Sequence, residues 1–319
     1  MSPELSGEYR ELLSLQHGII SRAQTLELGV GPRTVSSRLR SGRWPQLYRG
    51  VYATYTGELG REAWLWAAVL RVGPDAVLSY QTAAELDRLA PRPSTLIHVT
   101  VPRERHVRVI PGLVIHRCNR IQLARHPSLT PPRTRIEETA LDLAQSAADL
   151  DDAYAWLARA CAGRLTTPAR LWAAMAARRR MRWRGELAAA LGDVSAGAHS
   201  TLERRYIRDV ERAHRLPSAR RQVRTARGTR TEYKDALYEE FGVGVELDGD
   251  LAHPPEAHWR DRHRDNAAAV DGIITLRYSW PDVIRRPCHV AAQVAAVLRQ
   301  RGWRGRPRPC GSHCPVGKS

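Results

Sequence analysis

Apolar residues near the start of the chain recur at the spacing of short helices. They predict one helix over residues 8–16, where they share a single face. Ser21 and Gln24 have the spacing of a capping box, in which each side chain bonds the other residue's backbone N–H. This pair predicts the start of a second helix, and Gly29 predicts its end because glycine readily leaves the helical conformation.

A third helix is predicted to begin at Pro32, because proline fits the first helical position, and to bury Val35 and Leu39. Apolar and polar residues then alternate over residues 44–53, around a turn at Arg49-Gly50, which predicts a hairpin. Two helices joined by a tight turn and followed by a hairpin are typical of a winged helix-turn-helix. We predict this fold for residues 1–55.

The third helix of such a fold lies in the major groove of duplex DNA, where its polar face reaches bases and phosphates. The predicted DNA contacts on this helix are Arg33, Thr34, Ser37 and Arg38. The alternative is a small helical cap whose arginines are merely solvated.

Four further segments are predicted. Residues 56–150 combine helices with two alternating strands in a mixed α/β segment, in which His98 and His116 are expected to be ordinary packed or surface residues. The remaining segments are an Ala- and Arg-rich helical connector over 151–199, a second domain over 200–302, and a Pro- and Gly-rich flexible tail over 303–319.

The 200–302 domain mixes helices and strands. Helical patterns occupy residues 200–214, 256–270 and 288–301, and strand patterns occupy residues 232–239, 242–248 and 273–278. This order predicts a domain that combines helices with a β-sheet. The fold class of the chain is therefore predicted to be α/β.

Three carboxylates lie on the first two strands of that domain. Glu246 and Asp248 are two residues apart, so they are predicted to share the face opposite to the strand's apolar residues. Asp235 lies on the preceding strand, and three converging carboxylates suit a hard cation such as Mg²⁺ or Mn²⁺. Lys234 adjoins Asp235, so strand alternation predicts that its side chain points to the other face.

Charge is divided sharply along the same domain. The chain has 50 Lys+Arg against 33 Asp+Glu, a net charge of +17, and its only lysines are Lys234 and Lys318. Residues 204–230 hold ten arginines and two acidic residues, whereas residues 231–271 hold eleven acidic and four basic residues. A basic stripe beside an acidic pocket is what a metal-dependent nuclease needs. Two solvated faces of opposite charge are the alternative.

Several motifs of this domain resemble those of a known family. In chain order they are Leu202-Glu203-Arg204-Arg205-Tyr206, Tyr233-Lys234-Asp235, Val245-Glu246-Leu247-Asp248-Gly249, Arg260-Asp261-Arg262-His263-Arg264-Asp265-Asn266 and Thr275-Leu276-Arg277-Tyr278. They resemble the actinobacterial Vsr-like endonuclease domain, which is similar in fold to very-short-patch-repair and restriction endonucleases of the PD-(D/E)xK type. The resemblance implies a restriction-endonuclease-like α/β domain with a mixed central sheet. The N-terminal winged helix, with the segment Arg133–Ala144, resembles the AbiEi-type antitoxin domain.

The resemblance implies roles for individual residues. Asp235 matches the first metal-binding carboxylate, and Glu246 matches the acidic member of the (D/E)xK pair. Asp248 stands where the pattern has a lysine, which would orient the attacking water and offset phosphate charge. Glu203 matches a helix glutamate that sometimes joins the site, although its spacing from Ser200 is also that of a capping box.

The remaining candidates are cationic or titratable. His253, in the loop after the second strand, is the predicted general base or phosphate donor. Arg260 and Arg264 either replace the missing lysine or pair with acidic residues of their own helix. The residues predicted to hold the DNA backbone are Arg204, Arg220, Arg221, Arg260 and Arg264.

These patterns predict a DNA-binding protein with an endonuclease domain that hydrolyses phosphodiester bonds of double-stranded DNA with Mg²⁺ or Mn²⁺. The alternative is a non-catalytic AbiEi-type antitoxin or transcriptional repressor, with a cognate toxin-like protein as a possible second partner. An RNA-processing enzyme is a third interpretation.

No apolar run approaches the roughly 20 residues of a membrane span, so a cytoplasmic protein is expected. The oligomeric state is not predicted.

Cysteine and histidine residues also gather near the end of the chain. Cys310, His313 and Cys314 lie within five positions, and Cys288 or His289 are possible additions. A structural zinc site needs four ligands in a defined framework, whereas this tail is rich in proline and glycine. Zinc at Cys310, His313 and Cys314 is therefore not favoured, and a reduced tail without metal is expected.

Overall fold

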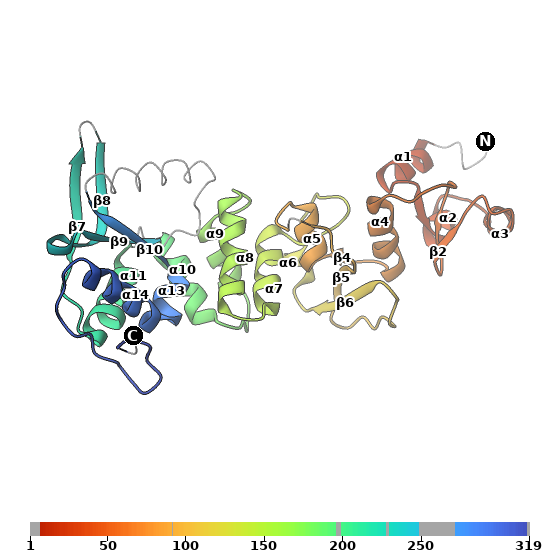
Figure 1. Cartoon of the computed structure of the whole chain (residues 1–319). Helices are drawn as coiled ribbons and strands as arrows, with labels where there is room; N and C mark the ends of the chain where they lie inside the picture. Colours follow the sequence, from red (N-terminus) through yellow and green to blue (C-terminus); the bar gives the residue numbers. More distant parts are fainter. Residues whose placement is uncertain (1–6, 91, 196–198, 228–229, 249–271, 318–319) are drawn as a thin grey trace. The chain divides into compact units, whose positions relative to one another are not determined.

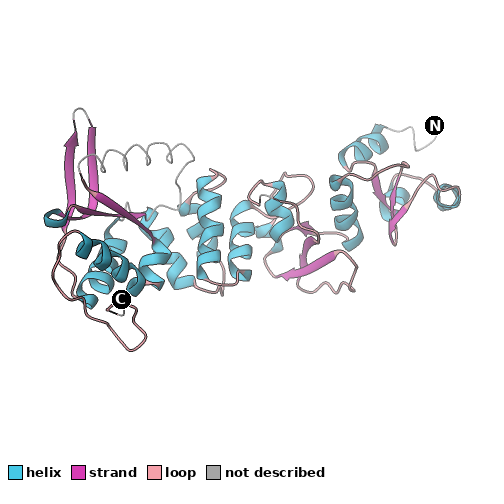
Figure 2. Ribbon diagram, in the orientation of Figure 1, coloured by secondary structure: helices cyan, strands magenta, loops and turns pink. Residues whose placement is uncertain are grey.

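The computed structural model describes residues 7–90, 92–195, 199–227, 230–248 and 272–317. The chain divides into two compact units, Met1–Leu143 and Ala144–Ser319. Each unit contains helices and strands, which confirms the predicted α/β class (Figure 1, Figure 2).

Unit 1 begins with the helices α1 (Gly7–Leu15), α2 (Arg22–Glu27) and α3 (Pro32–Arg40). The predicted capping box opens α2: the Gln24 N–H donates to Ser21 Oγ at 3.2 Å, and the Ser21 N–H donates to Gln24 Oε1 at 3.0 Å. Pro32 is the first residue of α3, as predicted. Gly29, with φ of 74°, follows the end of α2 and lets the chain turn toward α3.

A small antiparallel sheet completes this N-terminal module. The predicted hairpin is confirmed as β2 (Gln46–Tyr48) and β3 (Val51–Ala53), and the short strand β1 (Ile19–Ser21) adds to β3 in the order β1-β3-β2. The helices pack on it through a core of Tyr9, Ile20, Val30, Val35, Trp44 and Tyr52. This arrangement is winged-helix-like.

The rest of unit 1 is a three-stranded sheet with helices. The helices are α4 (Arg61–Val72), α5 (Tyr80–Leu86), α6 (Ile121–Ala124) and α7 (Ile136–Ser146), whose last residues lie beyond the unit boundary. The strands β4 (Val77–Leu78), β5 (Ile97–Pro102) and β6 (Leu113–Cys118) run in that order, with β5 and β6 parallel. The predicted helices and strands of this segment are therefore confirmed.

Unit 2 contains a four-stranded mixed sheet in the order β10-β9-β8-β7. Strands β7 (Arg220–Arg227), β8 (Arg230–Tyr238) and β9 (Val243–Asp248) are antiparallel, and β10 (Ile274–Ser279) runs parallel to β9. The helices are α8 (Leu150–Ala162), α9 (Pro168–Ala176), α10 (Arg184–Ser195), α11 (His199–Arg205), α13 (Trp280–Arg285) and α14 (Pro287–Gln300), with a π-helix η2 (Tyr206–Arg212) and a 3₁₀ turn η3 (Glu239–Phe241).

The helices after residue 144 pack with the C-terminal elements of unit 2. The rings of Tyr154 on α8 and Trp280 on α13 stack with centroids 6.1 Å apart. Asp151 accepts ion pairs from Arg285 at 3.1 Å and from Arg286 at 2.6 Å. The segment predicted as a connector is therefore packed into unit 2, where α8 contacts α13 and the residue after it.

The C-terminal tail packs side chains against the rest of unit 2. The segment predicted as a flexible tail buries Cys314 and Val316, which are 4% and 1% exposed. The helix predicted over residues 256–270 lies outside the described residues.

The two strand histidines of unit 1 form a packed pair. His98 Nδ1 and His116 Nε2 are 3.0 Å apart, and the ring of Tyr80 stacks on His116 with centroids 3.8 Å apart. Burial and, after it, the neighbouring His98 lower the pKa of His116 to about 4, and burial also lowers the pKa of His98. Both rings are half-buried and contact each other and Tyr80, so the expectation of packed histidines is confirmed.

We predict that this pair makes the stability of unit 1 depend on pH. At a pH above about 6.5, the pKa of an unfolded histidine, His116 is neutral in both states and its folded contacts contribute fully to the stability of unit 1. As the pH falls from there to about 4, the unfolded state binds a proton at His116 and the folded state does not, so that stability is lost. The free energy of unfolding should drop by about 1–2 kcal/mol over that range, allowing for partial solvent screening. His116→Asn should flatten the profile in urea titrations. His106→Asn, at an exposed loop position, is the control; equal profiles for the wild type and His116→Asn would contradict the prediction.

Candidate nucleic-acid interface and carboxylate cluster

Helix α3 presents a polar face because its two apolar residues point into the N-terminal core. Val35 is 6% exposed and Leu39 packs against the same core cluster. The other side of the helix carries exposed Arg33, Thr34 and Ser37, whereas the fourth predicted contact, Arg38, is half-buried and has further interactions. A short helix with an outward polar face can enter a major groove.

The segment that contains α3 is rich in arginine and has no carboxylate. No acidic residue occurs between Glu27 and Glu58, whereas five arginines do, and four of them have exposed side chains: Arg33, Arg40, Arg43 and Arg49. Arg49 lies at the hairpin turn, and Gly50 beside it has φ of 77°. Sequence reasoning missed Arg40, Arg43 and Arg49 as candidate phosphate contacts. The unbroken run of thirty residues without a carboxylate was the signal that could have found them.

The basic stripe of unit 2, residues 204–230, makes several ion pairs within the protein. Asp209 accepts from Arg205 at 3.3 Å and from Arg208 at 2.6 Å. Arg220 donates to Glu239 at 2.5 Å in an exposed pair. These contacts neutralise part of the predicted backbone-binding surface, because Arg205, Arg208 and Arg220 each have a local carboxylate partner. Arg204 is exposed and has interactions of its own.

Arg221 is half-buried and forms an ion pair inside unit 2. It pairs with Glu211, which is 4% exposed and also accepts from the Tyr238 hydroxyl at 2.8 Å. The hydroxyls of Tyr238 and Tyr206 are 3.1 Å apart. Burial raises the pKa of Glu211, and the positive charge of Arg221 opposes that shift. Arg221 therefore stabilises a buried carboxylate, a role that sequence spacing did not predict.

Glu246 lies in a buried charge cluster on the unit 2 sheet. Its Oε1 is 2.5 Å from Lys234 Nζ, and its Oε2 is 3.0 Å from Arg277 Nη2. Lys234 also donates to Thr275 Oγ1 at 3.1 Å. Lys234 and Glu246 are 3% and 7% exposed, so both charges are removed from solvent and each neutralises the other.

The expectation that Lys234 points away from the carboxylates is wrong. It assumed a regular strand, but the pairing of β8 with β9 ends at Ala236 and Val245. Just beyond that point the Asp235 side chain accepts the Leu247 N–H at 2.7 Å. The Lys234 side chain passes Gly244, where an added Cβ would lie 3.4 Å from it, and so reaches Glu246.

The predicted catalytic residues are only partly brought together. Asp235 and Glu246 lie on adjacent strands, where Asp235 accepts a backbone N–H and Glu246 pairs with Lys234. The side chain of Asp248 and the whole of His253, Arg260 and Arg264 lie outside the described residues.

Glu203 is half-buried in α11, which begins at His199. Ser200 therefore lies within this helix rather than at its N-cap, so the capping-box alternative does not account for Glu203. Its role in a nuclease site stays a prediction.

The donor set around Glu246 does not fit Mg²⁺ or Mn²⁺ as it stands. A divalent cation prefers several carboxylate oxygens, but each oxygen of Glu246 already faces a cationic side chain. Among the described residues, the one group of three or more His, Cys, Asp or Glu side chains close enough to hold a metal lies elsewhere, at the C-terminal tail.

The N-terminal module is thus a winged-helix-like domain with an electropositive helix. Residues 8–55 match the family described as "Transcriptional regulator, AbiEi antitoxin". This match agrees with the predicted antitoxin-type resemblance of the N-terminal segment and supports DNA binding there. No curated protein matches the chain. None of the helices in the described part of the chain has the length and apolar character that crossing a membrane demands.

We predict that Lys234 is essential to the stability of unit 2. Lys234→Met should lower the free energy of unfolding by about 3 kcal/mol, because it leaves a buried carboxylate with one cation fewer. Adding Glu246→Gln should recover part of that loss. Arg220→Gln breaks an exposed pair of the same sheet and should cost less than about 1 kcal/mol. Equal losses for Lys234→Met and Arg220→Gln in urea titrations would refute this role.

Proposed function

We propose that the protein is a DNA-binding transcriptional regulator of the antitoxin type, which reads duplex DNA through α3. The observation that carries the proposal is the outward polar face of α3 in a segment without acidic residues, within the region that matches the AbiEi antitoxin family. In this proposal arginines of α3 hold phosphates and position the helix, while the hydroxyl groups of Thr34 and Ser37 read base edges.

The charge distribution supports this assignment over binding through the unit 2 stripe. Arg33, Arg40, Arg43 and Arg49 are exposed, and no acidic residue lies near them in sequence. In unit 2, by contrast, Arg205, Arg208, Arg220 and Arg221 have carboxylate partners. A phosphate would have to compete with those partners, so we assign the counterion release that drives DNA binding first to the N-terminal module.

Proteins of the antitoxin type act with a partner, so a toxin-like protein is the second proposed partner, in the cytoplasm. The chain beyond residue 55, which includes the rest of unit 1 and all of unit 2, is available for that contact, because the family match ends there. In this proposal the buried Lys234–Glu246–Arg277 cluster serves to stabilise the sheet.

We predict that Arg33→Ala weakens binding of duplex DNA about 5- to 10-fold at moderate salt, and that Arg33→Ala/Arg38→Ala weakens it further. The slope of log affinity against log salt should become shallower by about one for each arginine–phosphate interaction removed. Fluorescence anisotropy with labelled duplex measures both quantities. Arg103→Ala, at an exposed loop position of unit 1, makes the same charge change and should have little effect. An unchanged salt slope in the double variant would exclude α3 as the reader.

A metal-dependent nuclease is the second candidate function. The observation that favours it is the position of Lys234 Nζ, 2.5 Å from Glu246, because it places a cation beside the carboxylate although position 248 holds an aspartate. The observation against it is that Glu246 has no oxygen without a cationic partner among the described residues. A divalent ion would have to displace Lys234 or Arg277.

A plasmid assay separates the two candidates. If the protein is a regulator, the wild type and Asp235→Ala/Glu246→Ala should both leave supercoiled plasmid intact in Mg²⁺ or Mn²⁺. Duplex binding measured on the same samples shows that both proteins are folded at their N-terminal module. Nicking by the wild type that disappears in the double variant would instead establish the nuclease.

A further inference from the structure

Four zinc-ligand side chains from separate parts of unit 2 meet at the C-terminal tail. They are His214, just after η2, Cys288, at the second position of α14, and Cys310 and Cys314 in the tail. One ligand atom from each lies within 4.8 Å of all the others. Three sulfurs and one imidazole nitrogen form one of the usual donor sets of structural zinc. We propose that these four residues bind a zinc ion.

His214 is oriented for this role. It is 1% exposed, and its Nδ1 lies 3.0 Å from the backbone oxygen of Val210, which can only accept a hydrogen bond. Nδ1 therefore carries the proton, and Nε2 carries a lone pair. Nε2 is buried and has no hydrogen-bond partner among the described residues. A zinc-binding histidine commonly donates its second ring N–H to a backbone carbonyl in this way, and a metal would satisfy the buried lone pair.

The sulfur atoms have a spacing that suits a shared metal. In a tetrahedral site with Zn–S bonds of about 2.3 Å, neighbouring sulfurs lie roughly 3.8 Å apart. Cys288 Sγ and Cys310 Sγ are 3.3 Å apart, well beyond the roughly 2.05 Å of a disulfide, and all three cysteines are free. A disulfide between any two of Cys288, Cys310 and Cys314 would leave the third thiol without a partner, whereas a zinc ion would bind all three sulfurs.

The tail is shaped so that both of its cysteines face the same point. The Cys314 N–H donates to the Gly311 carbonyl at 3.2 Å, which turns the chain between the two sulfurs. The Arg308 N–H donates to the His214 carbonyl at 2.8 Å and holds the tail against η2. Cys310 and Cys314 are four positions apart, within the usual spacing of paired zinc cysteines.

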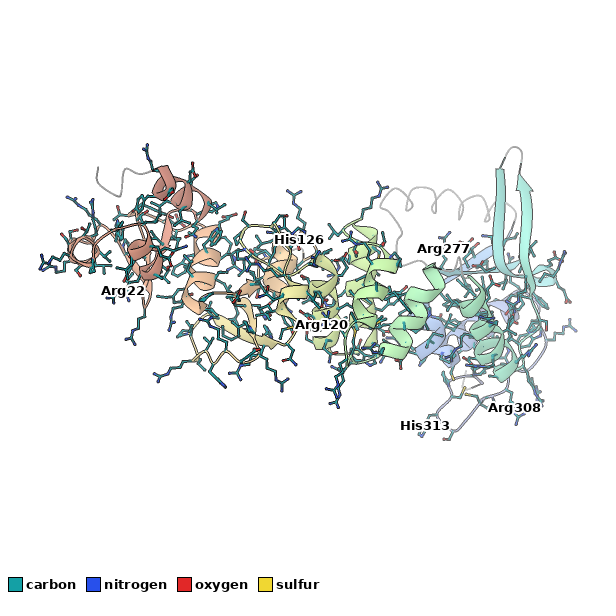
Figure 3. The ribbon with its side chains drawn as sticks, turned by 180° about the vertical axis from the view of Figure 1, so that it is seen from behind. Arg22, Arg120, His126, Arg277, Arg308 and His313 are labelled. Carbon is teal, nitrogen blue, oxygen red and sulfur yellow. The ribbon has the colours of Figure 1, made fainter. Side chains whose placement is uncertain are left out.

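This site differs from the tail cluster considered from sequence. His313 is exposed and lies outside the group of four, and its place is taken by His214, almost one hundred residues earlier (Figure 3). His289 is exposed as well. Since four protein ligands leave no open position, the ion would be structural rather than catalytic. It would join the tail to η2 and α14, where the described residues after 302 form no helix or strand of their own.

The test is metal analysis of the full chain, purified without a metal-affinity step. The wild type should contain about one zinc per chain by mass spectrometry of the metal. After chelation, added Co²⁺ should give the near-ultraviolet band of thiolate-to-metal charge transfer. Cys310→Ser should lower zinc affinity at least 100-fold. Because Cys310 is exposed, this variant leaves the packing of unit 2 in place.

His313→Asn is the matched control, since it removes a zinc-binding side chain from an exposed position of the same tail. It should keep one zinc and the cobalt band, as should Cys118→Ser. Hydrogen exchange at residues 303–317 should increase when zinc is removed from the wild type. A wild type without zinc or cobalt binding, or with Cys288 and Cys310 recovered as a disulfide in reducing buffer, would overturn the proposal. Equal zinc in Cys310→Ser and His313→Asn would do the same.

Discussion

Charged groups removed from water need partners, and this requirement organises unit 2 of the protein. Glu246 sits between Lys234 and Arg277, and each of its oxygens faces one of them. Glu211 is likewise buried against Arg221 and a tyrosine hydroxyl. Leaving any of these carboxylates unpaired would cost about 3–5 kcal/mol, a large part of the stability of a typical domain. The ion pairs of Glu246 and Glu211 therefore stabilise the sheet, and in the proposed regulator this is the role of Glu246.

The two sites that we propose lie toward the two ends of the chain. The N-terminal module needs no buried charge, because its apolar core holds α3 with its polar face outward. Its exposed arginines lie in a segment without carboxylates, so they remain available for phosphates. At the other end, soft ligands from His214 and the tail cysteines gather where the described chain forms no regular structure. A metal there would supply the order that the tail's proline- and glycine-rich sequence does not.

Local signals in the sequence predicted elements well, and contacts between distant residues were the main failures. Ser21 with Gln24, and Pro32, determine helix starts through neighbours within four positions, so α2 and α3 were predictable. Strand β1 has three residues and exists because it pairs with β3, which no local pattern reveals. The direction of Lys234 depended on where the β8–β9 pairing ends, and the proximity of His214 to Cys314 depended on the tail folding back.

The most direct test of this account is a titration of the protein with Mn²⁺, followed by electron paramagnetic resonance. If Lys234 and Arg277 neutralise Glu246, the wild type and Glu246→Gln should bind Mn²⁺ equally weakly, because position 246 offers no available carboxylate in either protein. One stoichiometric Mn²⁺ in the wild type that is lost in Glu246→Gln would contradict the account, since the carboxylate would then be serving a metal.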